Sequence, residues 1–210
     1  MAPTDTHQIA ALFDAMSGRY DRQMSTLERM LFPGSRAWVV SHARGTVLEL
    51  GVGTGLNLPL YGTDVRHVIG IDLSTGMLAH ARRRITDQQL TRVELHQGDV
   101  QTLELPTAST ETVVSTYTFC TIPDPLAASH EAYRILTPGG RFLLAEHGPS
   151  THRIGRAIQH GLEPLSVHFG ADHLLRDPRP YLQQAGFLLD HAHHAGRFGI
   201  GFRILAHKPS

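Results

Sequence analysis

The 210-residue chain lacks the features that would tie it to a nucleic acid, an oxidising compartment or the interior of a membrane. Its 19 basic and 19 acidic residues cancel, so net charge gives no argument for a nucleic-acid partner or an anionic membrane surface. One cysteine, Cys120, excludes an intrachain disulfide and fits a reducing cytosol. No apolar run approaches the roughly 18 residues of a spanning helix, and Asp5, His7 and Gln8 interrupt any signal-peptide pattern. A cytoplasmic protein without nucleic-acid partners is therefore expected.

The most informative feature present is a short apolar strand, residues 47–50, that runs into alternate glycines over residues 51–55. Glycine has no Cβ and turns readily with φ > 0, so this loop predicts close approach of the backbone to a nucleotide-type cofactor. A dinucleotide fingerprint would place its third glycine at Leu56, one residue after Gly55. Glu49 would repel a pyrophosphate but suits a cation. The loop therefore favours S-adenosylmethionine (SAM), which carries a sulfonium and an ammonium, over NAD.

Short β-branched runs alternate with helical patterns after this loop, which predicts a parallel sheet wound with helices. Ser74 and Asp124 are expected to start helices, with Arg82, Arg83 and Arg84 on a solvated helix face or, alternatively, at a phosphate or acidic lipid. Further strands are expected at residues 68–71, 93–97, 112–116 and 141–146, followed by a helical, irregular region 150–185 interrupted by Pro164, Pro178 and Pro180, and by an antiparallel hairpin of residues 187–194 and 200–207.

Ligands of such a sheet bind beyond the carboxyl ends of its strands. Asp72 closes the second strand 21 residues after Gly51, the usual place for a carboxylate that binds both ribose hydroxyls. Its alternative role is a helix cap shared with Ser74. Asp99 could accept a hydrogen bond from the exocyclic amine of adenine, with Gly98 and Val100 beside the ring, or could be a turn aspartate.

Together, Glu49-Leu-Gly-Val-Gly-Thr-Gly55, Ile69-Gly-Ile-Asp72-Leu-Ser-x-x-Met-Leu78, Gly98-Asp99 and Arg134-Ile-Leu-x-Pro-Gly-Gly140 resemble the class I SAM-dependent methyltransferases. The resemblance spans residues 46–147. It implies a doubly wound, Rossmann-like α/β fold: a seven-stranded, mostly parallel sheet with an antiparallel last strand and helices on both faces. It also implies the following cofactor-binding residues: Tyr20, Glu49, Gly51, Gly53, Thr54, Gly55, Asn57, Asp72, Leu73, Met77, Gly98, Asp99, Val100, Thr116 and Tyr117.

The segment Phe13-Asp-x-Met-Ser-x-Arg-Tyr-Asp21 resembles the entry segment of the ubiquinone and menaquinone C-methyltransferases, where a helix and a tyrosine fold over the cofactor. Tyr20 is thus a candidate lid and catalytic residue, or it packs one helix on the domain. One methyltransferase domain, residues 1–210, is expected. Its parts are an N-terminal helical cover (1–45), the SAM-binding core (46–147), a substrate-side cover (148–185) and a C-terminal β-hairpin (186–210).

Residues at the end of the fifth expected strand indicate how a methyl acceptor could be activated. His147 is the candidate general base or acceptor-orienting group, or a structural histidine at a strand end. Residues 118–123, 146–147 and 162–165 resemble small thiol and phospholipid N-methyltransferases, while the C-terminal signature of the quinone enzymes is not evident. Cys120 is interpreted as a packing residue. His191 and His193 would share a strand face, but no complete ligand set accompanies them and no metal is expected; His168 and His173 could contact the acceptor.

The leading hypothesis is a SAM-dependent enzyme that methylates a small, fairly apolar thiol, phenol or amine by in-line displacement. A phospholipid amine N-methyltransferase at a membrane surface is the first alternative. Apolar Leu27, Met30, Leu31 and Phe32 favour it, while the lack of a basic patch near them opposes it. The sequence thereby leaves a peripheral membrane contact open. A non-catalytic SAM-binding protein is the second alternative.

Overall fold

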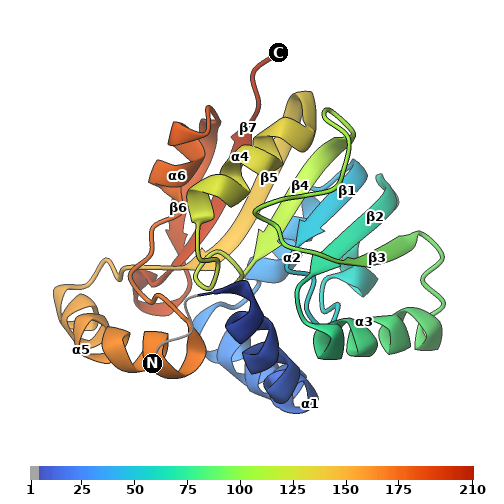
Figure 1. Cartoon of the computed structure of the whole chain (residues 1–210). Coiled ribbons are helices and arrows are strands. Elements are labelled where there is room, and N and C mark those ends of the chain that lie inside the picture. Colours follow the sequence, from blue (N-terminus) through green and yellow to red (C-terminus); the bar gives the residue numbers. More distant parts are fainter. Residues whose placement is uncertain (1–4) are drawn as a thin grey trace.

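The structure is a computed structural model that describes residues 5–210. Seven strands form one sheet in the order β3-β2-β1-β4-β5-β7-β6 (Figure 1). The first five strands pair in parallel, and β7 pairs antiparallel with both β5 and β6, so the expected seven-stranded sheet with its antiparallel insertion is confirmed. The strands are β1 (Gly45–Leu50), β2 (Val65–Asp72), β3 (Val93–Gln97), β4 (Thr110–Thr116), β5 (Leu136–His147), β6 (Leu188–Ala195) and β7 (Gly201–His207).

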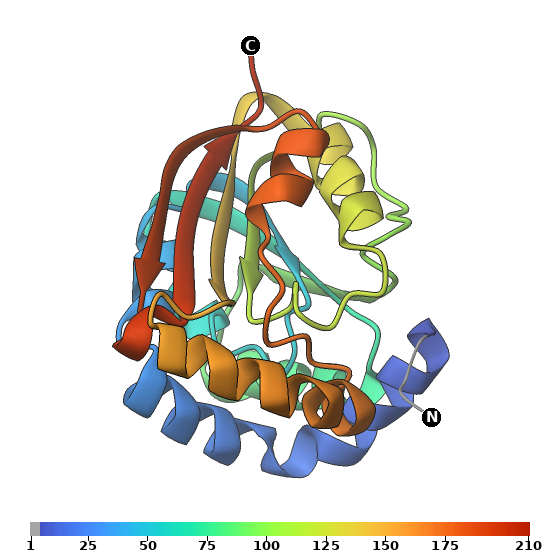
Figure 2. The same cartoon turned by 90° about the vertical axis from the view of Figure 1, so that its left-hand side faces the viewer.

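Helices cover both faces of the sheet and one of its ends. The α-helices are α1 (Thr6–Leu31), α2 (Ser35–Ser41), α3 (Thr75–Asp87), α4 (Pro125–Ile135), α5 (Arg153–Gly170) and α6 (Arg179–Gln184), and short 3-10 helices are η1 (Leu58–Leu60) and η2 (Arg197–Gly199). Figures 1 and 2 show α1 and α5 side by side across the end of the sheet at which the parallel strands finish. None of the described helices is long and apolar enough to cross a bilayer.

Alternate residues of the central strands enter two separate apolar cores, as strand geometry requires. Leu48 and Phe142 belong to the core beneath α4 and α6, whereas Val47 and Leu143 belong to the core that contains residues of α2 and α3. The side chains of these four residues are completely buried. This two-sided burial explains the nearly continuous apolar runs of the parallel strands.

The expected helix starts are confirmed. Ser74 Oγ accepts a hydrogen bond from Met77 N at 3.0 Å, and Asp124 Oδ1 accepts from the N–H groups of Leu126 and Ala127. Each cap satisfies backbone donors that the first helical turn leaves free.

Two boundaries differ from expectation. Pro164 lies inside α5 and does not interrupt it. Proline removes one backbone hydrogen bond of the helix, but no residue of α5 is buried, so the carbonyl left without that bond is not sealed from solvent. Strand β5 begins at Leu136, before the Pro138-Gly-Gly sequence that was expected to precede it. A register shift opposite Thr110 and a left-handed Gly139 (φ +71°), whose N–H donates to Lys208 O, keep this stretch within the sheet.

Candidate active site

Two adjoining cavities open where α1 and α5 cross the end of the sheet. The first encloses ≈ 610 Å³ of empty space, counted to its open mouth, and the second ≈ 910 Å³. Both lie within the ~300–1,000 Å³ range of small-molecule sites. Phe13, Tyr20, Tyr117 and Thr121 line both cavities and so form the wall between them.

The first cavity collects nine of the fifteen expected cofactor residues. These nine are Tyr20, Gly51, Gly53, Asp72, Leu73, Met77, Asp99, Val100 and Tyr117. Glu49, Thr54, Gly55, Asn57, Gly98 and Thr116 do not line it. Ile9, Phe13, Gln101, Thr118, Thr121, Ile122 and Pro123 also line it and were not among the expected residues. The four-residue spacing of Ile9 and Phe13, which places both on one face of a helix, could have indicated them.

The three glycines of the loop have different structural roles, although all have positive φ. A Cβ on Gly53 would meet nothing closer than Gly51 O at 4.0 Å, so this residue presents bare backbone to open space. A Cβ on Gly51 would collide with Thr118, and one on Gly55 would lie 2.7 Å from Leu58. Gly53 is therefore the position where a ligand can approach the backbone most closely, and the other two glycines permit tight packing.

Asp72 joins the glycine loop to the start of α3. Its Oδ2 accepts from Gly53 N at 2.8 Å and its Oδ1 from Ser74 N at 2.9 Å. Burial raises the pKa of this carboxyl, and these backbone bonds counteract part of the increase. Each oxygen retains a further lone pair, and Asp72 lines the cavity. The cap and the ligand-binding roles are thus compatible in one residue.

Asp99 forms a turn with Gln101. Its Oδ1 accepts from Gln101 N and from Gln101 Nε2, both at 2.9 Å, and both residues line the first cavity. Asp99 therefore forms a turn, and its carboxylate also lies on the wall of the first cavity, so the adenine contact stays a prediction.

Glu49 is buried behind the glycine loop, where its two carboxylate oxygens accept from Asn57 Nδ2 and Tyr61 Oη, each at 2.8 Å. Burial raises the pKa of Glu49 to about 7, and these two hydrogen bonds act in the opposite direction. Arg36 donates to Asn57 Oδ1 at 2.8 Å and pairs with Glu28 of α1. The Glu49 network thereby connects β1 to the α1 cover.

Three carboxylates of α1 recur at seven-residue spacing, and they lie on one face of the helix because seven residues make about two helical turns. Their contacts hold this face against the domain. Asp14 accepts from Ser74 Oγ and from Gly76 N, and Asp21 accepts from Thr54 Oγ1 and pairs with Arg84. Glu28 completes the row through Arg36. The expected solvated face therefore holds for Arg82 and Arg83 but is wrong for Arg84, whose Nε also donates to Thr54 O at 2.9 Å.

Tyr20 lies between the two cavities, with its ring centre 6.5 Å from that of Phe13. Desolvation raises the pKa of its hydroxyl, so the phenol stays neutral at physiological pH. Tyr117 belongs to the same wall and has a left-handed conformation (φ +55°), which is unusual for a bulky residue. Strained residues of this kind concentrate at functional sites.

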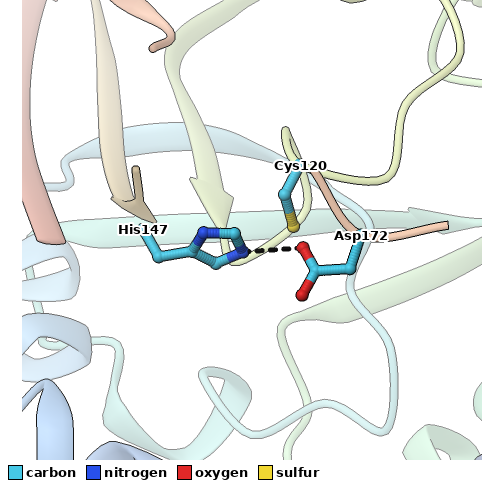
Figure 3. Close-up of side chains that lie close together, drawn as sticks. All are labelled: Cys120, His147 and Asp172. Atoms are coloured by element: carbon cyan, nitrogen blue, oxygen red, sulfur yellow. Dashed lines mark hydrogen bonds and ion pairs between the residues drawn. The ribbon is translucent and has the colours of Figure 1, made fainter. Parts of the chain in front are cut away.

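The second cavity contains the candidate base. His147 Nε2 and Asp172 Oδ1 are 2.8 Å apart, and Cys120 Sγ completes a group whose donor atoms lie within 4.8 Å of one another (Figure 3). His147 Nδ1 is buried without a partner among residues 5–210. Burial alone would lower the pKa of His147, but the bond to Asp172 and its charge outweigh burial and raise it. The same bond keeps the pKa of Asp172 low despite its burial.

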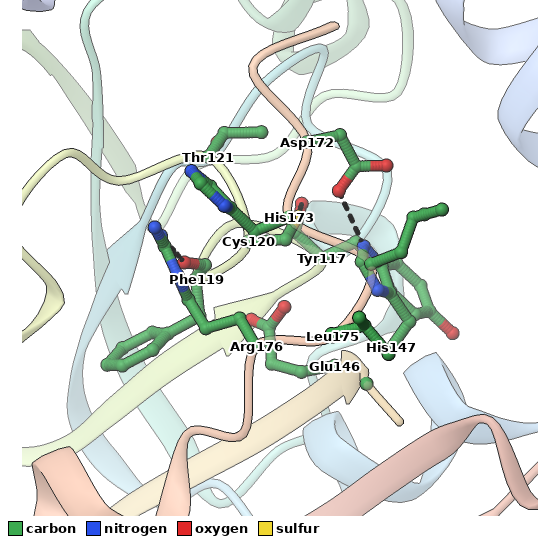
Figure 4. Close-up of polar contacts among 12 residues, drawn as sticks. Tyr117, Phe119, Cys120, Thr121, Glu146, His147, Asp172, His173, Leu175 and Arg176 are labelled. Carbon is green, nitrogen blue, oxygen red and sulfur yellow. Dashed lines mark hydrogen bonds and ion pairs between the residues drawn. The ribbon is translucent and has the colours of Figure 1, made fainter. Parts of the chain in front are cut away.

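Two ionisable residues, the buried Glu146 and the partly buried Arg176, lie near this group (Figure 4). Glu146 Oε1 accepts from Ser115 Oγ at 2.7 Å, and burial raises the pKa of Glu146. Arg176 donates to the carbonyls of Phe119 and Ile122 at 2.7 and 2.6 Å, which fixes the loop that carries Cys120. Burial raises the pKa of the Cys120 thiol well above its usual value, as befits a packing residue and not a nucleophile.

The other candidate histidines do not line either cavity, although His173 N donates to Cys120 O at 3.1 Å beside the second one. His191 and His193 share a face of β6, with ring centres 5.5 Å apart, and both are exposed. His168 is exposed beside Phe169, and His173 lies 3.4 Å from Glu163. Neither His168 nor His173 lines the second cavity.

A family of methyltransferase domains matches residues 48–144. A phosphatidylethanolamine N-methyltransferase from Cereibacter sphaeroides is 36% identical over 143 residues, which cover 64% of this chain and 70% of that protein. A demethylmenaquinone methyltransferase from Beutenbergia cavernae is 28% identical over an alignment that covers 96% of this chain and 87% of that protein. In fold, the chain is similar to a SAM-dependent methyltransferase from Thermotoga maritima, with a TM-score of 0.72 at 23% identity over 94% and 99% of the two chains.

The α/β fold, the glycine loop and the cavity at the strand ends define a nucleotide-cofactor enzyme of the Rossmann-like type. The chain belongs to the class I SAM-dependent methyltransferases. It is an enzyme, and its cofactor is SAM. The first cavity fits this cofactor, because it combines bare backbone at Gly53 with two carboxylates, Asp72 and Asp99, on its wall.

Proposed function

We propose that the enzyme transfers the methyl group of SAM to a small, fairly apolar thiol, phenol or amine held in the second cavity. The observation that carries this proposal is the wall shared by the two cavities, formed by Phe13, Tyr20, Tyr117 and Thr121. SAM supplies a methyl group already activated on a sulfonium. The chain then needs to bind, orient and desolvate the acceptor, and to take up its proton.

The cofactor site is proposed to use Asp72 for the ribose hydroxyls, Asp99 for the adenine amine and Gly53 for the methionine part. Leu73, Met77 and Val100 supply apolar contact at the same cavity wall. Glu49 is proposed to act from behind the loop, because its hydrogen bonds orient Asn57 and Tyr61 and because a cationic ligand would favour its ionised form over the neutral form that burial promotes. Tyr20 is proposed to close the wall as a lid residue.

His147 is proposed to accept the proton of the methyl acceptor. With Asp172 ionised, neutral His147 donates Nε2–H to it and leaves the Nδ1 lone pair without a partner. The raised pKa of His147 means that its neutral, basic form becomes more abundant as the pH rises through that value. Methyl transfer should therefore accelerate with pH over this interval.

The test measures S-adenosylhomocysteine production with panels of alkyl thiols, phenols and amines. At least one class should be methylated, and His147→Gln should slow its turnover by about 10²–10⁴-fold while SAM affinity stays within twofold of wild type. His191→Gln, a change at an exposed histidine outside the cavities, is the matched control. An unchanged rate in His147→Gln would refute the base role, and tight SAM binding with no turnover on any class would refute the proposed acceptor.

A phospholipid amine is the second candidate acceptor. The Cereibacter sphaeroides relative bears the name of a phosphatidylethanolamine N-methyltransferase, and Leu27 at the second cavity is 43% exposed. Vesicles that contain phosphatidylethanolamine, added as the sole acceptor, test this directly. Labelled methyl groups in the extracted lipid would favour it over soluble acceptors.

A further inference from the structure

Helix α5 directs polar side chains toward the domain. Gln159 Nε2 donates to Gly148 O at 2.9 Å, Glu163 accepts from Leu175 N at 3.2 Å, and Ser166 lines the second cavity. No residue of α5 is buried. The side of α5 that contacts the protein therefore carries polar side chains, and most of its large apolar side chains lie on another side.

The apolar side of α5 is a continuous exposed stripe. Five large side chains recur at intervals of three or four residues, which places them along one side of the helix over about 22 Å. They are Ile154 (77% exposed), Ile158 (57%), Leu162 (49%), Leu165 (55%) and Phe169 (69%). A contiguous apolar surface of this kind marks an interaction site, whereas single exposed apolar residues need no explanation.

Neighbouring elements extend the stripe. Ser150, just before α5, donates its hydroxyl to Phe198 O of η2 at 2.7 Å, and η2 in turn lies against the end of α1. Phe198, Met30 and Leu27 of these elements are 63%, 57% and 43% exposed. The α5 face is defined here as the five stripe residues together with Leu27, Met30 and Phe198.

The fully exposed charges of the elements that carry the α5 face are of one sign. The exposed charged residues of α5, η2 and residues 22–31 are all arginines. Arg156 is held against the protein, because its guanidinium donates to Ser150 O at 3.0 and 2.8 Å. The arginines that remain available at the surface are Arg22, Arg29, Arg153 and Arg197. None of them forms an ion pair within residues 5–210, and the carboxylates Glu28 and Glu163 of the same elements are turned inward to partners. Three arginines directly precede members of the face, at Met30, Ile154 and Phe198. Arginines that the neutral overall composition does not reveal therefore lie on the elements that carry the apolar surface.

The α5 face is continuous with the mouth of the second cavity, because Leu27 and Phe169 belong to both. We propose that the α5 face docks on the surface of an anionic lipid bilayer, with its apolar side chains in the headgroup and acyl boundary and its arginines at lipid phosphates. Helices that lie in the membrane interface combine apolar side chains with nearby basic side chains in this way. Docking in this orientation would place the second cavity at the lipid surface. Only the role of that cavity in binding the acceptor rests on the proposed function; the docking itself does not.

Vesicle flotation of the full chain tests the docking, with phosphatidylcholine vesicles and vesicles of phosphatidylcholine mixed with phosphatidylglycerol. Wild type should float with the mixed vesicles. Ile154→Ser with Ile158→Ser should lower its partition at least about tenfold, and Arg153→Gln with Arg197→Gln about fivefold per arginine. The control pair Leu60→Ser with Leu188→Ser alters residues of similar exposure, 48% and 54%, outside the face and should float like wild type.

Three results would overturn the docking proposal: no flotation of wild type with either vesicle, equal flotation of the Ile154/Ile158 variant, or a wild-type dimer in light scattering that this variant dissociates. SAM affinity by calorimetry, expected to be unchanged, confirms that each variant is folded. Turnover of soluble acceptors is measured separately, so failure of the proposed function and failure of docking give different patterns.

Discussion

The two cavities are built in different ways. The first is lined mainly by loops that follow β1, β2, β3 and β4, so the sheet itself brings Gly53, Asp72 and Asp99 together. The second is lined mainly by side chains of α1 and α5, with His147 as the contribution of the sheet. Strand order thus determines the first cavity, which we propose for SAM, and the placement of two covering helices determines the second cavity, which we propose for the methyl acceptor. Each change below is chosen to affect one cavity, the other, or the wall between them.

Asp72→Ala should have the largest effect and confine it to the first cavity. The change removes the proposed ribose contact and the acceptors of the Gly53 and Ser74 N–H groups. Calorimetry should show SAM affinity weakened by more than ~100-fold. Asp64→Ala, at an exposed aspartate beside β2, is the control. Unchanged affinity in Asp72→Ala would remove the ribose assignment.

Asp172→Asn should affect the second cavity alone. Without the carboxylate charge the pKa of His147 falls, so the inflection of the pH–rate profile should move to lower pH, and turnover should drop about tenfold or more because the ring loses its orienting acceptor. Asp190→Asn is a matched control, since Asp190 bonds His207 at 2.9 Å on the surface. A profile that does not move would separate His147 from proton transfer.

Tyr20→Ala should affect both cavities because the ring belongs to their common wall. We expect SAM affinity and turnover each to fall by roughly tenfold, in line with the loss of one aromatic contact. Tyr20→Phe preserves the ring, and the hydroxyl it removes is neutral, so its affinity should match wild type. Equal behaviour of the Ala and Phe variants would exclude a role for the ring as a lid.

Asp21→Asn should have a small effect, limited to the attachment of α1 over the first cavity. The Asp21–Arg84 pair is partly exposed, so its loss should weaken SAM binding by no more than about fivefold, and less at high salt. Asp87→Asn at the end of α3 provides the comparison. A larger loss that is insensitive to salt would mean that Asp21 contacts the ligand directly.

The smallest expected effect is on stability. Because the folded pKa of His147 is raised, its stabilisation is complete below about pH 6.5 and is lost as the pH rises through the folded value. The folded pKa of Asp172 is lowered, so its stabilisation is complete above about pH 3.9 and is lost as the pH falls through the folded value. Urea unfolding should therefore show that Asp172→Asn costs of order 1 kcal/mol near pH 6 and less near pH 9. A constant difference would uncouple the pair from folding.

Nine of the fifteen residues that the sequence proposed for the cofactor line the first cavity, because most of them occupy fixed positions at strand ends. Asp72 and Asp99 follow β2 and β3, and parallel strands end at one edge of the sheet. The sequence could not separate the roles of Gly53 and Gly55, since spacing alone does not show which glycine faces open space. Seven-residue spacing of Asp14, Asp21 and Glu28 was a visible signal for the attachment of α1.

The second cavity was largely hidden from the sequence. His147 could be selected at its strand end, but Asp172 follows a helix in a segment without a motif, and only tertiary packing brings it to 2.8 Å from the imidazole. The basic surface around α5 was likewise missed because arginines from three separate elements converge in space. The sequence also predicted that Pro164 interrupts the helical region, but a helix without buried residues tolerates this proline.

A crystal structure of the S-adenosylhomocysteine complex tests the division into two cavities most directly. The account predicts that adenosine lies between Asp72 and Asp99, that the sulfur faces the wall formed by Tyr20, Tyr117 and Thr121, and that the cavity with His147 and Asp172 stays open beyond it. A ligand that fills the second cavity, or a sulfur that points away from that wall, would contradict the account.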